Sequence, residues 1–194
     1  MGYHRNKIAV SVSPSAFFLG SLLLLILPLR WLLAALSAAL IHEFCHLAAV
    51  KLTGGYIYGI SIGRSGAAIN IGPMDSRKEL ICALAGPLGG FILLLFARWL
   101  PRIAICAGIQ SIYNLLPVYP LDGGRALQCA AAIYFRPETG ERICNFAEIL
   151  CKVMLIGLAI YSTVALKLGF LPMFAVCIIL FKTKSGKIPC KLPV

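Results

Sequence analysis

Long apolar runs separated by short polar or charged segments dominate the chain. The runs cover residues 16–27, 29–52, 80–100, 103–135, 143–166 and 170–181. Proline, glycine pairs and basic residues stand between them, and these residues end or flank helices in membranes. Because a helix needs about 20 apolar residues to cross a bilayer, the pattern predicts an all-α polytopic membrane protein with about six transmembrane helices.

Residues 56–72 follow a different pattern. Ile60 and Ile62, and then Ile69 and Ile71, alternate with small or polar residues. The sequence Gly63-Arg64-Ser65-Gly66 separates the two alternating stretches. Alternation with a period of two and a turn between predicts a small β-hairpin directly after the second apolar run.

The run 103–135 is too long for one helix and is interrupted. Pro117, Pro120 and the pair Gly123-Gly124 predict a helix to about Leu116, a non-helical turn and a second helix from about Arg125. Irregular backbone at membrane depth is tolerated only where protein or a water-filled cavity surrounds it. The break therefore predicts a functional region.

Composition excludes several classes of protein. The chain has 194 residues, of which 60% are hydrophobic and 13% charged, whereas soluble domains are about a quarter charged. This balance excludes an ordinary soluble domain, a disordered chain and a nucleic-acid-binding module. Six spans use roughly 120 residues, so we expect one transmembrane domain over residues 1–194. The eight cysteines show no paired Cys-x-x-Cys spacing, which argues against a disulfide framework.

The net charge of +11 is spread singly or in pairs at the ends of the apolar runs. If both termini are cytosolic, most lysines and arginines fall in cytosolic loops. The positive-inside rule therefore predicts a multi-pass protein of the bacterial cell membrane with both termini in the cytosol.

The strongest chemical motif is His42-Glu43-Phe44-Cys45-His46 in the second apolar run. On a helix the two histidines lie one turn apart on one face, so both imidazoles can reach one zinc ion. Glu43 is then placed to take a proton from a zinc-activated water. Ionisable residues within a span cost at least about 2.5 kcal/mol unless paired or ligated. A metal centre explains three of them together better than a polar patch between helices.

A catalytic zinc site needs a third protein ligand. The remaining histidine, His4, lies in the polar amino-terminal segment, and most acids fall in loops or at span edges. Glu148 precedes Lys152 by four residues, so an ion pair within one helix is expected. Asp122 remains, in the interrupted run, and we predict it as the third ligand. A helix N-cap is a second role for Asp122, compatible with the first.

These motifs resemble one family. An HExxH motif in a span, followed by Asn114-Leu-Leu-Pro117-Val-Tyr-Pro120-Leu-Asp122-Gly-Gly-Arg125, is similar to the site-2 protease family of intramembrane zinc metalloproteases, and most similar to its sporulation stage IV FB proteases. The resemblance covers about residues 35–135, and the segment Ala85-Gly86-Pro87 also matches. It implies a catalytic core at about residues 29–135.

The resemblance implies roles for individual residues. His42, His46 and Asp122 would bind one Zn²⁺, Glu43 would act as the base, and Asn114 would orient substrate or stabilise the oxyanion. No PDZ or CBS domain is expected in the chain. For the hairpin at 56–72, docking of an extended substrate and simple covering of a loop both stay open.

The expected function is cleavage of a membrane-embedded or membrane-associated protein near the cytosolic face. By resemblance, a sporulation sigma-factor precursor is the expected substrate, and a membrane-bound anti-sigma factor is second. The expected partners are this substrate, the lipid bilayer and regulatory membrane proteins, with no nucleic acid. A zinc-binding transporter or channel is the alternative, and a catalytically inactive scaffold is a third.

Overall fold

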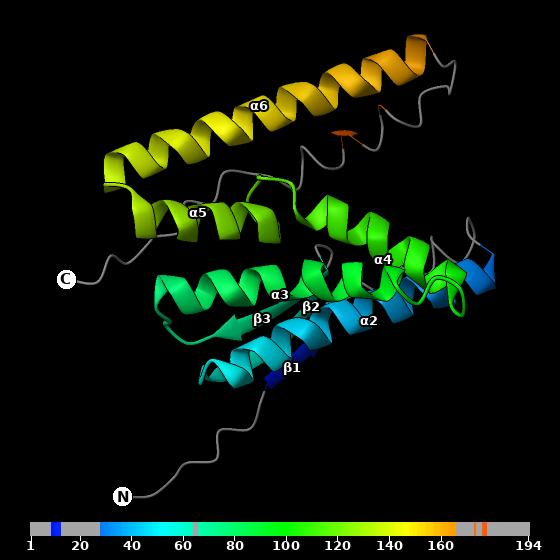
Figure 1. Ribbon diagram of the computed structural model, residues 1–194, viewed down its shortest axis with the longest axis horizontal. Coiled ribbons are helices and arrows are strands. Elements are labelled where there is room, and N and C mark those ends of the chain that lie inside the picture. The colour runs from blue at the N-terminus through cyan, green and yellow to red at the C-terminus, as the bar shows by residue number, and fades with distance from the viewer. Residues whose placement is uncertain (1–8, 13–27, 64–65, 166–172, 174–175, 178–194) are drawn as a thin grey trace, which may run out of the picture. The chain divides into compact units, whose positions relative to one another are not determined.

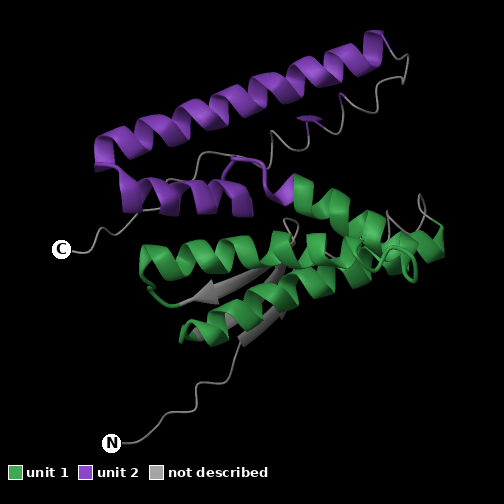
Figure 2. Cartoon of the chain, in the orientation of Figure 1, with its two compact units in different colours: residues 1–112 green, residues 113–194 purple. Residues whose placement is uncertain are grey.

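The computed structural model describes residues 9–12, 28–63, 66–165, 173 and 176–177. Most of these described residues are helical, and they also form a small sheet (Figure 1). The elements are β1 (Ala9–Val12), α2 (Leu29–Leu52), β2 (Ile57–Gly63), β3 (Gly66–Ile71), α3 (Ser76–Leu94), α4 (Pro101–Asn114), α5 (Asp122–Tyr134) and α6 (Pro137–Val164). The chain divides into two compact units, residues 1–112 and 113–194, with the boundary near the end of α4 (Figure 2).

Helix α2, with 24 residues, is the longest described helix of the first unit and buries one of its faces. Ala34, Ala38, His42, His46 and Val50 follow one another at intervals of four residues and are all buried. Large apolar side chains on its other faces are exposed, among them Leu36, Leu40 and Phe44. The helix ends at Thr53, whose hydroxyl donates to the Ala49 carbonyl at 2.8 Å. Gly54 follows with φ of 76°, the left-handed conformation that stops a helix.

Helix α3 packs against α2 within the same unit. Its buried residues are all small or compact: Cys82, Ala83, Gly86, Pro87 and Gly90. Small residues let two helix backbones approach closely, which is how helices associate in a bilayer, where hydrophobic burial gives little driving force. The α2–α3 pair is therefore the packed core of the first unit.

The sheet has the strand order β1-β2-β3. β2 and β3 pair antiparallel, with Ile60 opposite Ile69 and Gly63 opposite Gly66. These strands lie in the region where the alternating pattern predicts a hairpin. The sequence did not predict β1, which pairs parallel to β2 from residue 9 to 12. A four-residue strand contains too few positions for alternation to show. β2 is thus the central strand, and β3 is an edge strand.

The apolar runs and the helices differ in detail. The apolar run 80–100 is helical only to Leu94, and Pro101, the residue that follows this run, is the first residue of α4. Proline suits the first turn of a helix because the N–H groups there have no partner in the helix. The second half of the interrupted run begins at Asp122, three residues before the expected Arg125. The expected first span and most of the sixth lie outside the described residues.

Two described helices, α2 and α6, are long and apolar enough to cross a membrane, by length and composition alone. This supports the expected membrane location, while the count of six spans stays a prediction. The apolar part of α3 from residue 80 to 94 rises about 22 Å at 1.5 Å per residue, less than a bilayer core of about 30 Å.

In the second unit, α5 packs against α6. Gly140, in the first turn of α6, lies against the backbone and side chain of Ala131. Lys152 donates to Glu148 at 2.6 Å within α6, so the ion pair expected from the spacing of these residues is confirmed.

Candidate metal centre

His42 and His46 lie together on the buried face of α2. Their side chains are 3% and 8% exposed, and their Nε2 atoms are 3.2 Å apart. The rings meet edge to face, with an interplanar angle of 83°. If an ion lay at the usual zinc–nitrogen distance of about 2.0–2.1 Å from both atoms, the angle between the two nitrogens at the ion would be about 100°, close to the tetrahedral value. The geometry of the pair therefore fits a tetrahedral metal.

A hydrogen bond from the other side of the ring fixes the orientation of His46. Nδ1 of His46 lies 2.7 Å from the backbone carbonyl oxygen of Cys82, in α3. Because a carbonyl can only accept, Nδ1 carries the proton and donates it. In the neutral ring, Nε2 is then the atom with the lone pair. This is the tautomer that lets a histidine bind a metal through Nε2.

Glu43 follows His42 directly in α2 and is half-buried. A helix places neighbouring residues about 100° apart, so Glu43 projects from the flank of the face that carries the histidines. The helical HExxH arrangement predicted from the sequence is thus formed in α2.

Asp122 and Asn114 belong to the second unit. Asn114 is the last residue of α4, Asp122 is the first residue of α5, and both are half-buried. The expectation that Asp122 is the N-cap is wrong, because Leu121 holds that position. At the first helical position the Asp122 carboxylate is instead stabilised by the positive end of the helix dipole.

The turn before α5 is held by its own backbone. The N–H of Leu121 donates to the Val118 carbonyl at 2.9 Å, and the N–H of Arg125 donates to the Leu121 carbonyl at 3.0 Å. A Cβ at Gly123 would collide with the carbonyl of Leu115. The glycine therefore lets the turn fold against the first turn of α5, and this fixes where α5 and Asp122 begin.

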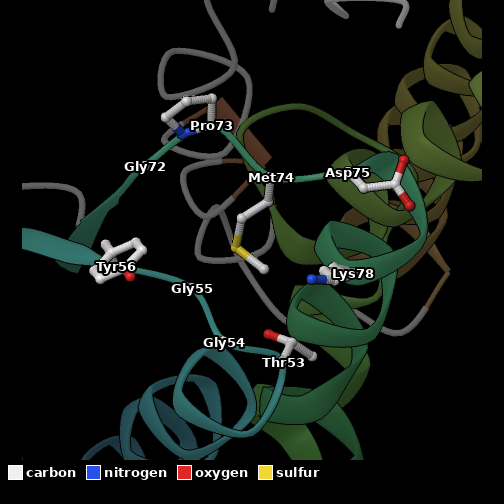
Figure 3. A pocket seen from close by; sticks show the side chains of 9 residues that line it. All are labelled: Thr53, Gly54, Gly55, Tyr56, Gly72, Pro73, Met74, Asp75 and Lys78. Atoms are coloured by element: carbon white, nitrogen blue, oxygen red, sulfur yellow. The ribbon is translucent and has the colours of Figure 1, made fainter.

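A cavity of about 250 Å³ lies beyond the carboxyl end of α2 (Figure 3). It is lined by the two connections that flank the sheet and by the first turn of α3. The lining residues are Thr53, Gly54, Gly55, Tyr56, Gly72, Pro73, Met74, Asp75 and Lys78. Neither histidine contributes to this lining. Met74 packs against the cluster of Ala49, Val50 and Cys82, which are buried next to it.

Sequence reasoning missed the Cys82 carbonyl. A backbone oxygen has no signature in a sequence, because every residue carries one. The nearest signal in the sequence is the Ala85-Gly86-Pro87 segment. This segment matches the family, but the match assigns it no role.

Comparison with known families gives a direct match. A family model described as Peptidase M50B-like matches residues 16–118. The chain belongs to this family. The resemblance to site-2 proteases expected from the motifs is thereby confirmed.

A curated protein and a solved structure illustrate the similarity of the chain to known proteins. The chain is 26% identical over 177 residues to Stage IV sporulation protein FB of Bacillus subtilis (strain 168). That match covers 84% of the chain and 61% of the relative, so the chain spans about three-fifths of the relative's length. The solved Site-2 Protease from Methanocaldococcus jannaschii matches with a TM-score of 0.61 at 17% identity, over 97% of this chain and 96% of that one. The second match shows a shared fold.

Removing either histidine should abolish stabilisation by zinc. Zinc at 100 times its dissociation constant should stabilise the wild type by about 2.7 kcal/mol, and a chelator should reverse this. We expect His42→Ala and His46→Ala to show no such shift in thermal unfolding of the purified protein. Phe44→Ala is the control, because Phe44 lies between the two histidines in sequence but is 68% exposed. A full zinc-dependent shift in either histidine variant would exclude that residue as a ligand.

Proposed function

We propose that this protein is an intramembrane zinc endopeptidase. The observation that carries the proposal is the pair of buried histidines on α2, whose Nε2 atoms are 3.2 Å apart and face each other. Membership of the Peptidase M50B-like family supports it. In this proposal the metal is Zn²⁺, and Asp122, Glu43 and Asn114 complete the centre.

His42, His46 and Asp122 are proposed to hold the metal. Two neutral imidazoles and one carboxylate are a common donor set for catalytic zinc. The burial of the three side chains supports this assignment, because both histidines are buried and Asp122 is half-buried. A carboxylate and a dication also offset each other's cost of burial.

Glu43 is proposed as the general base. When bound, zinc supplies polarisation of the scissile carbonyl and makes a water acidic enough to be deprotonated near neutral pH. Glu43 would accept a proton from the water that attacks the carbonyl carbon, and would give it to the amide nitrogen as the peptide C–N bond breaks. Asn114 is proposed to donate its amide N–H to the oxyanion that develops on the carbonyl oxygen.

The substrate is proposed to be a membrane-embedded or membrane-associated protein, cut near the cytosolic face. His46 precedes Lys51, an exposed cation at the carboxyl end of α2, by five residues. At 1.5 Å per residue this places the centre roughly 7.5 Å inside the boundary. β3 is at the edge of the sheet and lies in the chain between α2 and α3. The backbone of an edge strand is suited to pair with an extended segment of a substrate.

The similarity to a sporulation protein supports one substrate class. We propose a sporulation sigma-factor precursor, with a membrane-bound anti-sigma factor second, processed by regulated intramembrane proteolysis. A transporter would need polar side chains along a whole path. Among the described residues, the buried polar side chains are His42, His46, Ser111 and Ser162, which favours a single centre.

Glu43→Gln should abolish cleavage while leaving zinc bound. Glutamine keeps the shape of the side chain but cannot accept the proton, so the rate should fall by about 10²- to 10⁴-fold. The measurement is product formation on co-expression with candidate membrane-tethered substrates, with zinc content determined on the purified protein. Glu138→Gln, at an exposed position in the first turn of α6, is the control. Substantial cleavage by Glu43→Gln would remove Glu43 from the role of base.

Asp122→Ala should lower zinc affinity, because one of three protein ligands is lost. Asp75→Ala is the matched control, since Asp75 is an exposed carboxylate that belongs to neither motif. Zinc affinity would be measured by competition with a chelator. Equal affinities in the two variants would exclude Asp122 as a ligand.

We propose a topology of six spans with both termini in the cytosol. This topology places the two ends of α3 on opposite sides of the membrane. Lys78, in its first turn, and Arg98, in the turns that follow it, are both exposed basic residues. In a background with the native cysteines replaced, Lys78→Cys should react with an impermeant thiol reagent only from the cytosolic side, and Arg98→Cys only from the outside. The reverse pattern would show an inverted topology, and labelling of both from one side would show that α3 does not cross.

A further inference from the structure

Helix α3 has no side chain where it passes the two histidines. A Cβ built on Gly86 would collide with Nε2 of His46 and would lie 2.6 Å from its Cε1 and 2.8 Å from Cε1 of His42. Real Cβ atoms do not approach other heavy atoms this closely. The backbone of α3 therefore lies directly against the edges of both rings that carry the ligand atoms.

The same turn of α3 supplies the hydrogen bond that orients His46. The Cys82 carbonyl, which accepts from Nδ1 of His46 at 2.7 Å, is four residues before Gly86. In an α-helix, the N–H of residue 86 points to the carbonyl of residue 82. One helical turn thus lies against His46 on both sides: the Cys82 carbonyl accepts from Nδ1, and the backbone at Gly86 lies beside Nε2.

Glycine in the middle of a helix destabilises the helix relative to alanine, so its presence there calls for a reason. At Gly157, in α6, a Cβ would meet nothing within 4 Å. At Gly89, three residues further along α3, it would meet Sγ and Cβ of Cys45, which is not a proposed zinc ligand. Gly86 differs from both, because the atoms it makes room for are the proposed zinc ligands.

We infer that residues 82–86 of α3 are a positioning element for the metal ligands, with Gly86 as the positioning residue and the Cys82 carbonyl as the acceptor that fixes the His46 tautomer. The element acts through the histidines and does not itself bind the metal. This inference rests on the proposed zinc centre and extends it to a second helix. It predicts that a single methyl group at residue 86 displaces the two rings and weakens metal binding.

The test compares three Gly→Ala variants of the full chain, purified in detergent. Zn²⁺ affinity is measured by competition with a chelator, and the visible spectrum is recorded with Co²⁺ in place of zinc. Gly86→Ala should bind zinc about 10- to 100-fold more weakly than wild type and show an altered Co²⁺ spectrum. Gly89→Ala changes α2–α3 packing at Cys45 and should keep the wild-type spectrum and affinity within a few-fold. Gly157→Ala should match wild type in both.

The outcomes separate the possible explanations. Wild-type affinity in Gly86→Ala would overturn the inference, and so would an equal loss in Gly89→Ala, which would reduce Gly86 to general packing. Failure of the wild type to bind zinc would instead refute the proposed function. If Gly86→Ala does not fold, ¹⁵N-histidine NMR of the metal-free wild type decides. The proton of neutral His46 should be on Nδ1, and a proton on Nε2 would overturn the inference.

Discussion

The hydrogen bond from His46 to the Cys82 carbonyl is the constraint on which the candidate centre depends. An imidazole buried in an apolar environment needs a partner for its N–H group, or it costs free energy. The partner here is a backbone oxygen on another helix, 2.7 Å away. This hydrogen bond therefore links α2 to α3, and it also selects the tautomer of His46. With Nδ1 satisfied, Nε2 is the ring atom left to face His42, and the pair has the geometry that a metal requires.

This bond can form only because α3 comes close to α2. The buried face of α3 carries cysteine, alanine, glycine and proline, and these residues keep the helix backbone near the rings. Glycine and proline weaken an isolated helix. In a bilayer, however, close backbone packing is the main source of helix association. The large apolar side chains of α2 point outward instead, where lipid suits them.

The break between α4 and α5 determines how the carboxylate of Asp122 is stabilised. A carboxylate in an uninterrupted helix at membrane depth has no local stabilisation. The turn before Asp122 starts a new helix at that residue, so its carboxylate lies at the positive end of a helix dipole. The turn satisfies part of its own backbone through short local hydrogen bonds. Irregular backbone is thus tolerated here because the chain itself supplies partners.

The sequence alone determined the local features. The HExxH motif requires only a helix, and a 24-residue apolar run forms one. The spacing of Glu148 and Lys152 likewise determined their ion pair, because both residues lie on one helix face. Ion pairs and ligand pairs one turn apart follow from helical geometry, which is the same in every protein.

Tertiary structure decided the features that depend on distant partners. The strand β1 pairs with residues some fifty positions later in the chain, and four residues carry too little pattern to predict it. The start of α5 at Asp122, and not at Arg125, depends on how the preceding turn folds over Gly123. The Cys82 carbonyl and the space at Gly86 were also invisible in the sequence. A backbone oxygen and a missing side chain acquire a role only when packing brings another helix against them.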